Sequence, residues 1–188
     1  MRKKLILGVS GVRGSFSEEA ALHFSKKNNL DCTLEYLVDM EGVLSAFDRN
    51  AIDLGVFPVV NNNAGLVQAA FIAMGKRSFT YLENIWLEIN HCLLAKPGIQ
   101  LQQIQKIISY PQALLQCKQY LGQHFKNAEL VEWDDTAKAA NDLAKNILDD
   151  TSAVIASESC AKIYGLSILE KNIQDINPNM TAFILVKK

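Results

Sequence analysis

The feature that most constrains the fold of this chain is its alternation between short apolar runs and segments with helical signals. A continuous apolar run such as 54–60 is typical of a strand that is covered on both faces. Helical signals follow these runs, as where Ser17 stands before the acidic pair Glu18 and Glu19, a pattern that predicts an N-cap and a favourable first turn. Strands that alternate with helices predict an α/β fold with mostly parallel sheets.

The pattern divides into two Rossmann-like α/β lobes. The stretch 80–95 is long and alternating, and we interpret it as a crossover between lobes. The first lobe then comprises residues 1–79 plus 161–188, and the second comprises residues 80–160. The expected strands are 4–9, 32–38, 54–60, 104–109, 128–133, 153–157 and 180–186, and helices are expected to start at Ser17 and to span 40–48, 66–74, 111–121, 136–148 and 159–164.

Composition excludes several classes of protein. The 19 Lys and Arg residues are balanced by 20 Asp and Glu residues, so no basic surplus exists to bind nucleic acid. No apolar run approaches the roughly 20 residues of a membrane span, and the apolar stretch 5–9 is too short for a signal peptide. We therefore expect a cytoplasmic protein without a membrane partner. The four cysteines form no Cys-x-x-Cys pair, and buried reduced thiols are expected.

Polar loops follow the predicted strands, where ligands bind in open α/β sheets. The loop 11–17 combines two glycines with Ser15 and Ser17, and the loop 58–65 carries Asn61 and Asn62. Turns and helix caps explain the same residues equally well. Two further loops, at 109–112 and 134–137, precede helices in the second lobe.

No nucleophile–base pair stands out from the residues alone. The three histidines, at positions 23, 91 and 124, are interpreted as structural, and no cluster has the spacing of metal ligands. We expect neither a metal nor an organic cofactor. The residues by themselves predict a two-lobed α/β protein that binds a small polar or anionic ligand in a cleft.

The same loops, taken in order, resemble the catalytic domain of prephenate dehydratases. Residues 11–21 are similar to the family's Gly-Pro-x-Gly-Thr-Phe/Tyr-Ser-x-x-Ala-Ala, and residues 109–117 to Ser-His-Pro-Gln-Ala-Leu-x-Gln-Cys. Residues 179–183 resemble Asn-x-Thr-Arg-Phe. Each fragment is weak alone, but their joint order is specific. The other matching segments are 53–65, 91–94, 135–140, 153–157, 164–166 and 172–175.

The resemblance implies a fold like a type II periplasmic binding protein, with the active site in the cleft between the lobes, and a homodimer. It also implies that the regulatory ACT domain of many relatives is missing here. The implied reaction converts prephenate to phenylpyruvate in phenylalanine biosynthesis. Thr181 is expected to donate a proton to the leaving hydroxyl. The expected substrate-binding residues are Ser15, Ser17, Asn61, Asn62, Ser109, Gln112, Ala182, Phe183 and Arg13.

Departures from the family pattern leave alternatives open. Ala182 replaces the Arg of Thr-Arg-Phe, which is expected to bind a substrate carboxylate, and Val60 replaces the Glu of Glu-Asn-Ser. We hypothesise that Arg13 supplies the missing cation. The alternatives are a non-aromatising prephenate decarboxylase, which keeps the hydroxyl, and a non-catalytic protein that binds small anions. Arogenate also remains open as the substrate.

Overall fold

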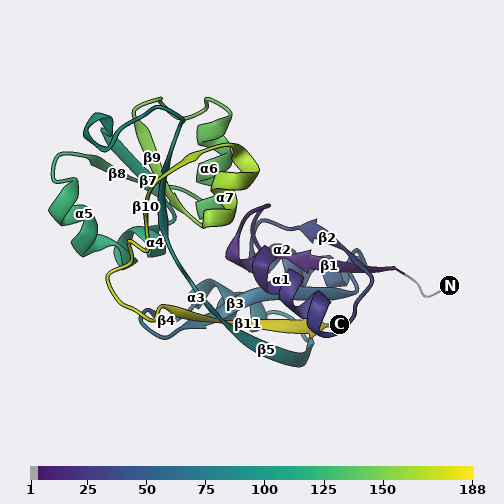
Figure 1. The fold of residues 1–188 in the computed structure, drawn as a ribbon. Helices are drawn as coiled ribbons and strands as arrows, with labels where there is room; N and C mark the ends of the chain where they lie inside the picture. The colour runs from purple at the N-terminus through teal and green to yellow at the C-terminus, as the bar shows by residue number, and fades with distance from the viewer. Residues whose placement is uncertain (1–3) are drawn as a thin grey trace. The chain divides into compact units, whose positions relative to one another are not determined.

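The computed structural model describes residues 4–188 and has two compact α/β units (Figure 1). The first unit contains the chain up to Glu88 and again from Met180 onward, and the second runs from Ile89 to Asn179. The predicted lobes change at 79/80 and 160/161, before the observed divisions. The reason is strand pairing: β5 (Thr80–Glu88) joins the first unit's sheet, and β10 (Ser167–Lys171), which the sequence analysis missed, joins the second.

The sheet of the first unit has the strand order β2-β1-β3-β11-β5, with the short β4 paired to β3. The strands β1, β2 and β3 are parallel, while β11 runs antiparallel to both of its neighbours. The other elements of this unit are β1 (Leu5–Val9), β2 (Cys32–Tyr36), β3 (Leu54–Asn61), β4 (Gly65–Leu66), β11 (Met180–Lys187), α1 (Phe16–Lys27), α2 (Met40–Asp48) and α3 (Gln68–Met74).

The two faces of this sheet are covered by different helices. The crossovers from β1 to β2 and from β2 to β3 run in opposite directions, so right-handed connections place α1 and α2 on opposite faces. A Cβ on Gly55 would lie 2.6 Å from Val43 of α2, and Val186 stands beside Gly55 in the register. Since side chains alternate along a strand, Ala182 shares the α2 face with Val186, and Thr181 lies on the α1 face.

Helix α1 begins two residues earlier than the sequence predicts. Ser15 is its N-cap and accepts a hydrogen bond from the Glu18 backbone, so the prediction of Ser17 as N-cap is wrong. Gly14, with φ of +90°, turns the chain immediately before the cap, and only glycine adopts this conformation readily. Ser17 instead lies in the first turn, where its hydroxyl is 3.1 Å from that of Ser10.

The second unit has a sheet of order β10-β6-β9-β7-β8. Strand β7 runs parallel to both β8 and β9, so these three strands end at the same edge, and a helix follows each of them. The predicted helix 111–121 is two helices that meet at Cys117. The elements of this unit besides β10 are β6 (Cys92–Ala95), β7 (Lys106–Ser109), β8 (Glu129–Glu132), β9 (Ser152–Ala156), α4 (Pro111–Gln116), α5 (Lys118–His124), α6 (Thr136–Ala144) and α7 (Glu158–Tyr164), with a 3-10 turn at Leu101–Gln103.

Candidate functional site

A buried hydrogen bond joins Thr181 and Asn61 at the end of the first unit's sheet where β3 finishes. The two residues stand opposite each other in the β11–β3 register, and the Asn61 Nδ2 donates to Thr181 Oγ1 over 2.9 Å. Thr181 is 8% exposed and Asn61 is 5% exposed. This contact links residues 120 positions apart in the chain.

The orientation of the Asn61 amide follows from its other contacts. Its Oδ1 accepts hydrogen bonds from the backbone N–H groups of Asn63 and Ala64, each at 2.9 Å. These two bonds require the oxygen, so the amide nitrogen must face Thr181. A hydroxyl has one proton and two acceptor sites. Asn61 occupies one acceptor site of the Thr181 hydroxyl, and none of the hydrogen bonds found within residues 4–188 has this hydroxyl as its donor, so its proton can be directed to a ligand.

Asn62 holds the start of β11 in place. Its backbone N–H donates to the Met180 carbonyl at 2.9 Å, and its side-chain Oδ1 accepts from the Met180 N–H at 2.7 Å. Asn62 therefore fixes the residue that precedes Thr181. The structure brings Asn61 into contact with Thr181 and places Asn62 against Met180, the preceding residue.

The loop 11–17 forms the start of α1, which lies on the same sheet face as Thr181. Ser15 and Ser17 are both buried, and Arg13 is exposed. The Glu18 carboxylate accepts from the Gly14 N–H and from the Tyr36 hydroxyl. The loop's own N–H groups are thus partly used by Glu18, a residue that the sequence analysis treated only as a favourable first-turn charge.

Two predicted binding residues in the Thr181 strand are core positions. Ala182 and Phe183 are each 2% exposed. Ala182 lies on the α2 face, opposite Val60 in β3 and Trp86 in β5, so the strand does not bring it to the same face as Thr181. Phe183 shares the face of Thr181 but packs in the interior.

In the second unit, Ser109 lies at the end of β7, and Gln112 lies in the first turn of α4. The Ser109 hydroxyl is fully buried and donates its proton to the Ile155 carbonyl over 2.7 Å. Ser109 therefore ties β7 to β9 and retains only acceptor capacity. Gln112 is half-buried.

A polar network that the sequence analysis missed ties together the segments where the chain enters and leaves the second unit. The Ile89 N–H donates to the Asn179 carbonyl at 2.7 Å, and the Asn179 Nδ2 donates back to the Ile89 carbonyl at 3.2 Å. His91 Nε2 lies 2.7 Å from Gln116 Oε1, which also accepts from Asn179. Burial lowers the pKa of His91, although the Gln116 contact opposes this shift. The sequence signal that could have indicated this network is the presence of polar residues directly beside apolar strands.

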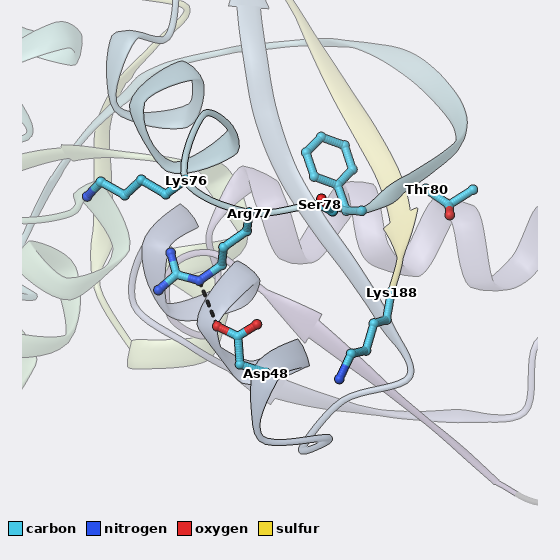
Figure 2. Close-up of a pocket in the computed structure, with 7 residues that line it drawn as sticks. Asp48, Lys76, Arg77, Ser78, Thr80 and Lys188 are labelled. Atoms are coloured by element: carbon cyan, nitrogen blue, oxygen red, sulfur yellow. Dashed lines mark hydrogen bonds and ion pairs between the residues drawn. The ribbon is translucent and has the colours of Figure 1, made fainter.

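A hollow in the first unit lies at the other end of its sheet (Figure 2). Thr80, in its wall, stands beside Lys187 in the register, six residues along β11 from Thr181, or about 20 Å. Arg77 Nε donates to Asp48 there at 2.9 Å. The hollow measures about 650 Å³ and is lined by Asp48, Lys76, Arg77, Ser78, Phe79, Thr80 and Lys188.

Residues 4–188 contain neither a cluster of metal-ligating side chains nor a membrane-spanning helix. No group of three or more His, Cys, Asp or Glu side chains there is arranged to hold a metal ion. No helix in the same range is both long and apolar enough to cross a bilayer. Cys92, Cys117 and Cys160 are buried free thiols, and Cys32 is half-buried.

Comparison with known proteins decides the family. The sequence profile of prephenate dehydratase matches residues 7–188. This chain belongs to the prephenate dehydratase family. Arogenate dehydratase/prephenate dehydratase 2 of Arabidopsis thaliana is 35% identical over 178 residues, which cover 95% of this chain and 45% of that relative. The chain thus spans less than half the length of the curated relatives it matches.

Solved structures agree with this family. The prephenate dehydratase of Arthrobacter aurescens, determined in complex with L-Phe, has a TM-score of 0.83 and 25% sequence identity over 98% of this chain and 60% of its own. Lipoprotein Tp32 of Treponema pallidum has a TM-score of 0.55 and 16% sequence identity over 98% of this chain and 83% of its own. The predicted α/β fold, shared with prephenate dehydratases and type II periplasmic-binding-like proteins, is confirmed.

The pairing of β3 with β11 brings together two positions at which this chain departs from the prephenate dehydratase pattern. Val60, at the motif's Glu position, stands directly opposite Ala182, at the motif's Arg position. Directly opposed side chains of antiparallel strands are neighbours on one face. A Glu and an Arg at these positions would therefore be cross-strand neighbours, and this chain replaces both with small apolar residues. Both departures therefore fall at one cross-strand position, and neither residue carries a charge in this chain.

Proposed function

We propose that this chain converts prephenate to phenylpyruvate, with Thr181 donating the proton to the leaving hydroxyl. The observation that carries this proposal is the buried Asn61–Thr181 hydrogen bond, which occupies an acceptor site of the hydroxyl and leaves its proton for a ligand. The family membership supports the same reaction. The proposal places the protein in phenylalanine biosynthesis.

The reaction requires a proton donor at one place. The bond from the ring to its carboxylate breaks, and its electron pair forms a ring double bond as carbon dioxide leaves. The bond from the ring to the hydroxyl breaks at the opposite ring carbon, and the hydroxyl departs as water once it has received a proton. A positioned donor at this oxygen accelerates such a step by about 10²–10⁴-fold. The Thr181 hydroxyl is the group that we assign to this role.

Anion binding falls to the surroundings of Thr181 in this proposal. Ser15 and Ser17 lie at the start of α1, a helix of 12 residues whose N-terminal dipole favours negative charge. We propose that Arg13, exposed in the same loop, supplies the cation for a substrate carboxylate. In this proposal Asn61 positions Thr181 through its hydrogen bond to the hydroxyl.

The position of the two uncharged residues Val60 and Ala182 favours dehydration of prephenate over the decarboxylase alternative. Both residues lie on the sheet face opposite Thr181, so their replacement leaves the proton donor and its Asn61 partner intact. A decarboxylase that keeps the ring hydroxyl has no need for a donor held in this way. We further propose that the protein acts as a cytoplasmic homodimer without a nucleic-acid partner.

Incubation of the purified protein with prephenate at neutral pH tests the reaction, with products identified by mass spectrometry. Phenylpyruvate must form faster than in a control without protein and in the Thr181→Ala variant, because prephenate decays by itself in acid. A product that lacks only carbon dioxide would instead establish a decarboxylase. Unchanged prephenate would leave ligand binding as the function. A parallel incubation with arogenate distinguishes the two substrates.

A further inference from the structure

The segment that carries Arg13 lies between two glycines, so its backbone is flexible unless other contacts hold it. Gly11 and Gly14 have φ values of +108° and +90°. Glycine loses more conformational freedom on ordering than any other residue. The Arg13 side chain is exposed. An arginine that binds a carboxylate from such a segment loses the entropy of its side chain and of its backbone, and a backbone that is already fixed removes the second cost.

The Glu18 carboxylate holds this segment from the first turn of α1. Ser15 and Glu18 form a variant of the capping box, in which the N-cap side chain and the side chain three residues later each accept a backbone N–H. The Glu18 N–H donates to Ser15 Oγ at 3.3 Å. Glu18 Oε2 accepts from the N–H of Gly14, one residue before the N-cap. Glu18 therefore fixes the peptide group that joins Arg13 to Gly14.

Tyr36 in turn fixes the Glu18 carboxylate. The Tyr36 hydroxyl donates to Glu18 Oε1, while Gly14 donates to the other oxygen of the same carboxylate. Tyr36 is the last residue of β2 and stands beside Val9, the last residue of β1, in the parallel register. Both strands therefore end at the edge of the sheet where the loop 11–17 begins. Hydrogen bonds to a charged acceptor are about twice as strong as those between neutral groups, so this contact ties β2 firmly to the loop.

We propose that Glu18 and Tyr36 are positioning residues, which hold the Arg13 backbone in place for the binding of a substrate carboxylate. This inference rests on the proposed function, in which Arg13 supplies the cation and Thr181 the proton. Glu18 and Tyr36 then act on the binding of prephenate and not on the proton transfer. A contact that contributes equally to substrate binding and to transition-state binding lowers KM and leaves kcat unchanged.

Removal of the Tyr36 hydroxyl tests this inference with the smallest change. In Tyr36→Phe, the KM for prephenate should rise about three- to tenfold, the effect of one lost hydrogen bond, with kcat within about twofold of the unmodified protein. Glu18→Ala should raise KM at least as much. Glu18→Gln should keep KM within about twofold, because its amide accepts from Gly14 and donates to the Tyr36 oxygen. A KM in Glu18→Gln as high as that of Glu18→Ala would overturn the positioning role.

Two further variants separate positioning from a general effect of charge or stability. Glu19→Ala removes the same charge from the same turn of α1, at an exposed position, and should not raise KM. A rise equal to that in Glu18→Ala would overturn the inference. In an Arg13→Ala background, Tyr36→Phe should raise KM no further, because the cation that it positions is already gone. Fully additive effects of these two substitutions would also overturn the inference.

Calorimetric titration of the same variants with prephenate distinguishes this inference from the proposed reaction. If the unmodified chain binds prephenate without forming phenylpyruvate, the reaction alone is contradicted, and the dissociation constants replace KM in every comparison. An unchanged affinity in Tyr36→Phe, with a circular dichroism spectrum that shows it folded, would overturn the inference even where Glu18→Ala does not fold. An unmodified chain that does not bind prephenate would overturn the inference together with the proposed function.

Discussion

At the residue scale, the account depends on the environment of the Thr181 hydroxyl. The family resemblance predicts Thr181 and Asn61 as site residues, but it does not predict their hydrogen bond, because that contact depends on how β3 and β11 align. The same register separates Ala182 from Thr181, two adjacent residues that the sequence motif groups together. Periodicity alone could have indicated this separation, since adjacent residues of a strand point to opposite faces.

Asn61→Asp isolates the donor function of the Asn61 amide. The carboxylate still accepts from the N–H groups of Asn63 and Ala64, so the turn is retained, but it offers no N–H to Thr181. We expect kcat for prephenate to fall roughly 10–100-fold, with a thermal midpoint within a few degrees of the unmodified protein. Steady-state kinetics and thermal unfolding measure the two effects, and an unchanged kcat would refute the positioning role of Asn61.

At the element scale, strands and helices with strong local signals were predictable. The bounds of α2 agree with the predicted helix 40–48, and β3 extends one residue beyond the predicted strand. Strand β10 was missed because its identity as a strand depends on pairing with β6, a partner distant in sequence. The boundaries of the units were displaced for the same reason, since the sequence does not show which sheet β5 joins.

The alignment of β3 with β11 predicts energetic coupling between positions 60 and 182. Ala182→Arg places a charge at a site that is 2% exposed, and Val60→Glu alone introduces an unpartnered acid beside it. Each single variant should destabilise the protein by about 1–3 kcal/mol. The double variant should be more stable than the sum of the two losses by about 0.5–3 kcal/mol. Urea unfolding measures the cycle, and strictly additive losses would exclude a cross-strand pair at these positions.

At the scale of the whole molecule, buried His91 makes stability depend on pH. Burial lowers the pKa of His91, so the unfolded chain takes up a proton on this residue more readily than the folded chain does. The contribution of neutral His91 to the free energy of unfolding is therefore fully present above pH ~6.5. It is lost as the pH falls below that value, because the unfolded chain then binds the proton more readily. Burial raises the pKa of Glu19 and of Asp135. These two residues therefore affect the pH dependence of stability in the opposite sense.

Unfolding by urea between pH 7.5 and pH 5 measures this contribution. We expect His91 to add a slope of at most about 1.4 kcal/mol per pH unit below pH ~6.5, with stability decreasing as the pH falls. The His91→Gln variant should lose this slope, whatever its stability at pH 7.5. The control variant His23→Gln changes an exposed histidine of α1 and should keep it. Parallel pH profiles for the unmodified protein and His91→Gln would show that His91 is not responsible.

The most direct test of the central claim compares Thr181→Val with Thr181→Ser in prephenate turnover. Valine keeps the shape of threonine without a hydroxyl, and serine keeps the hydroxyl that Asn61 holds. The account predicts that kcat falls by about 10²–10⁴-fold in Thr181→Val and clearly less in Thr181→Ser, since only valine removes the proton donor. Phenylpyruvate formation by Thr181→Val at the rate of the unmodified protein would contradict the assignment of Thr181 as that donor.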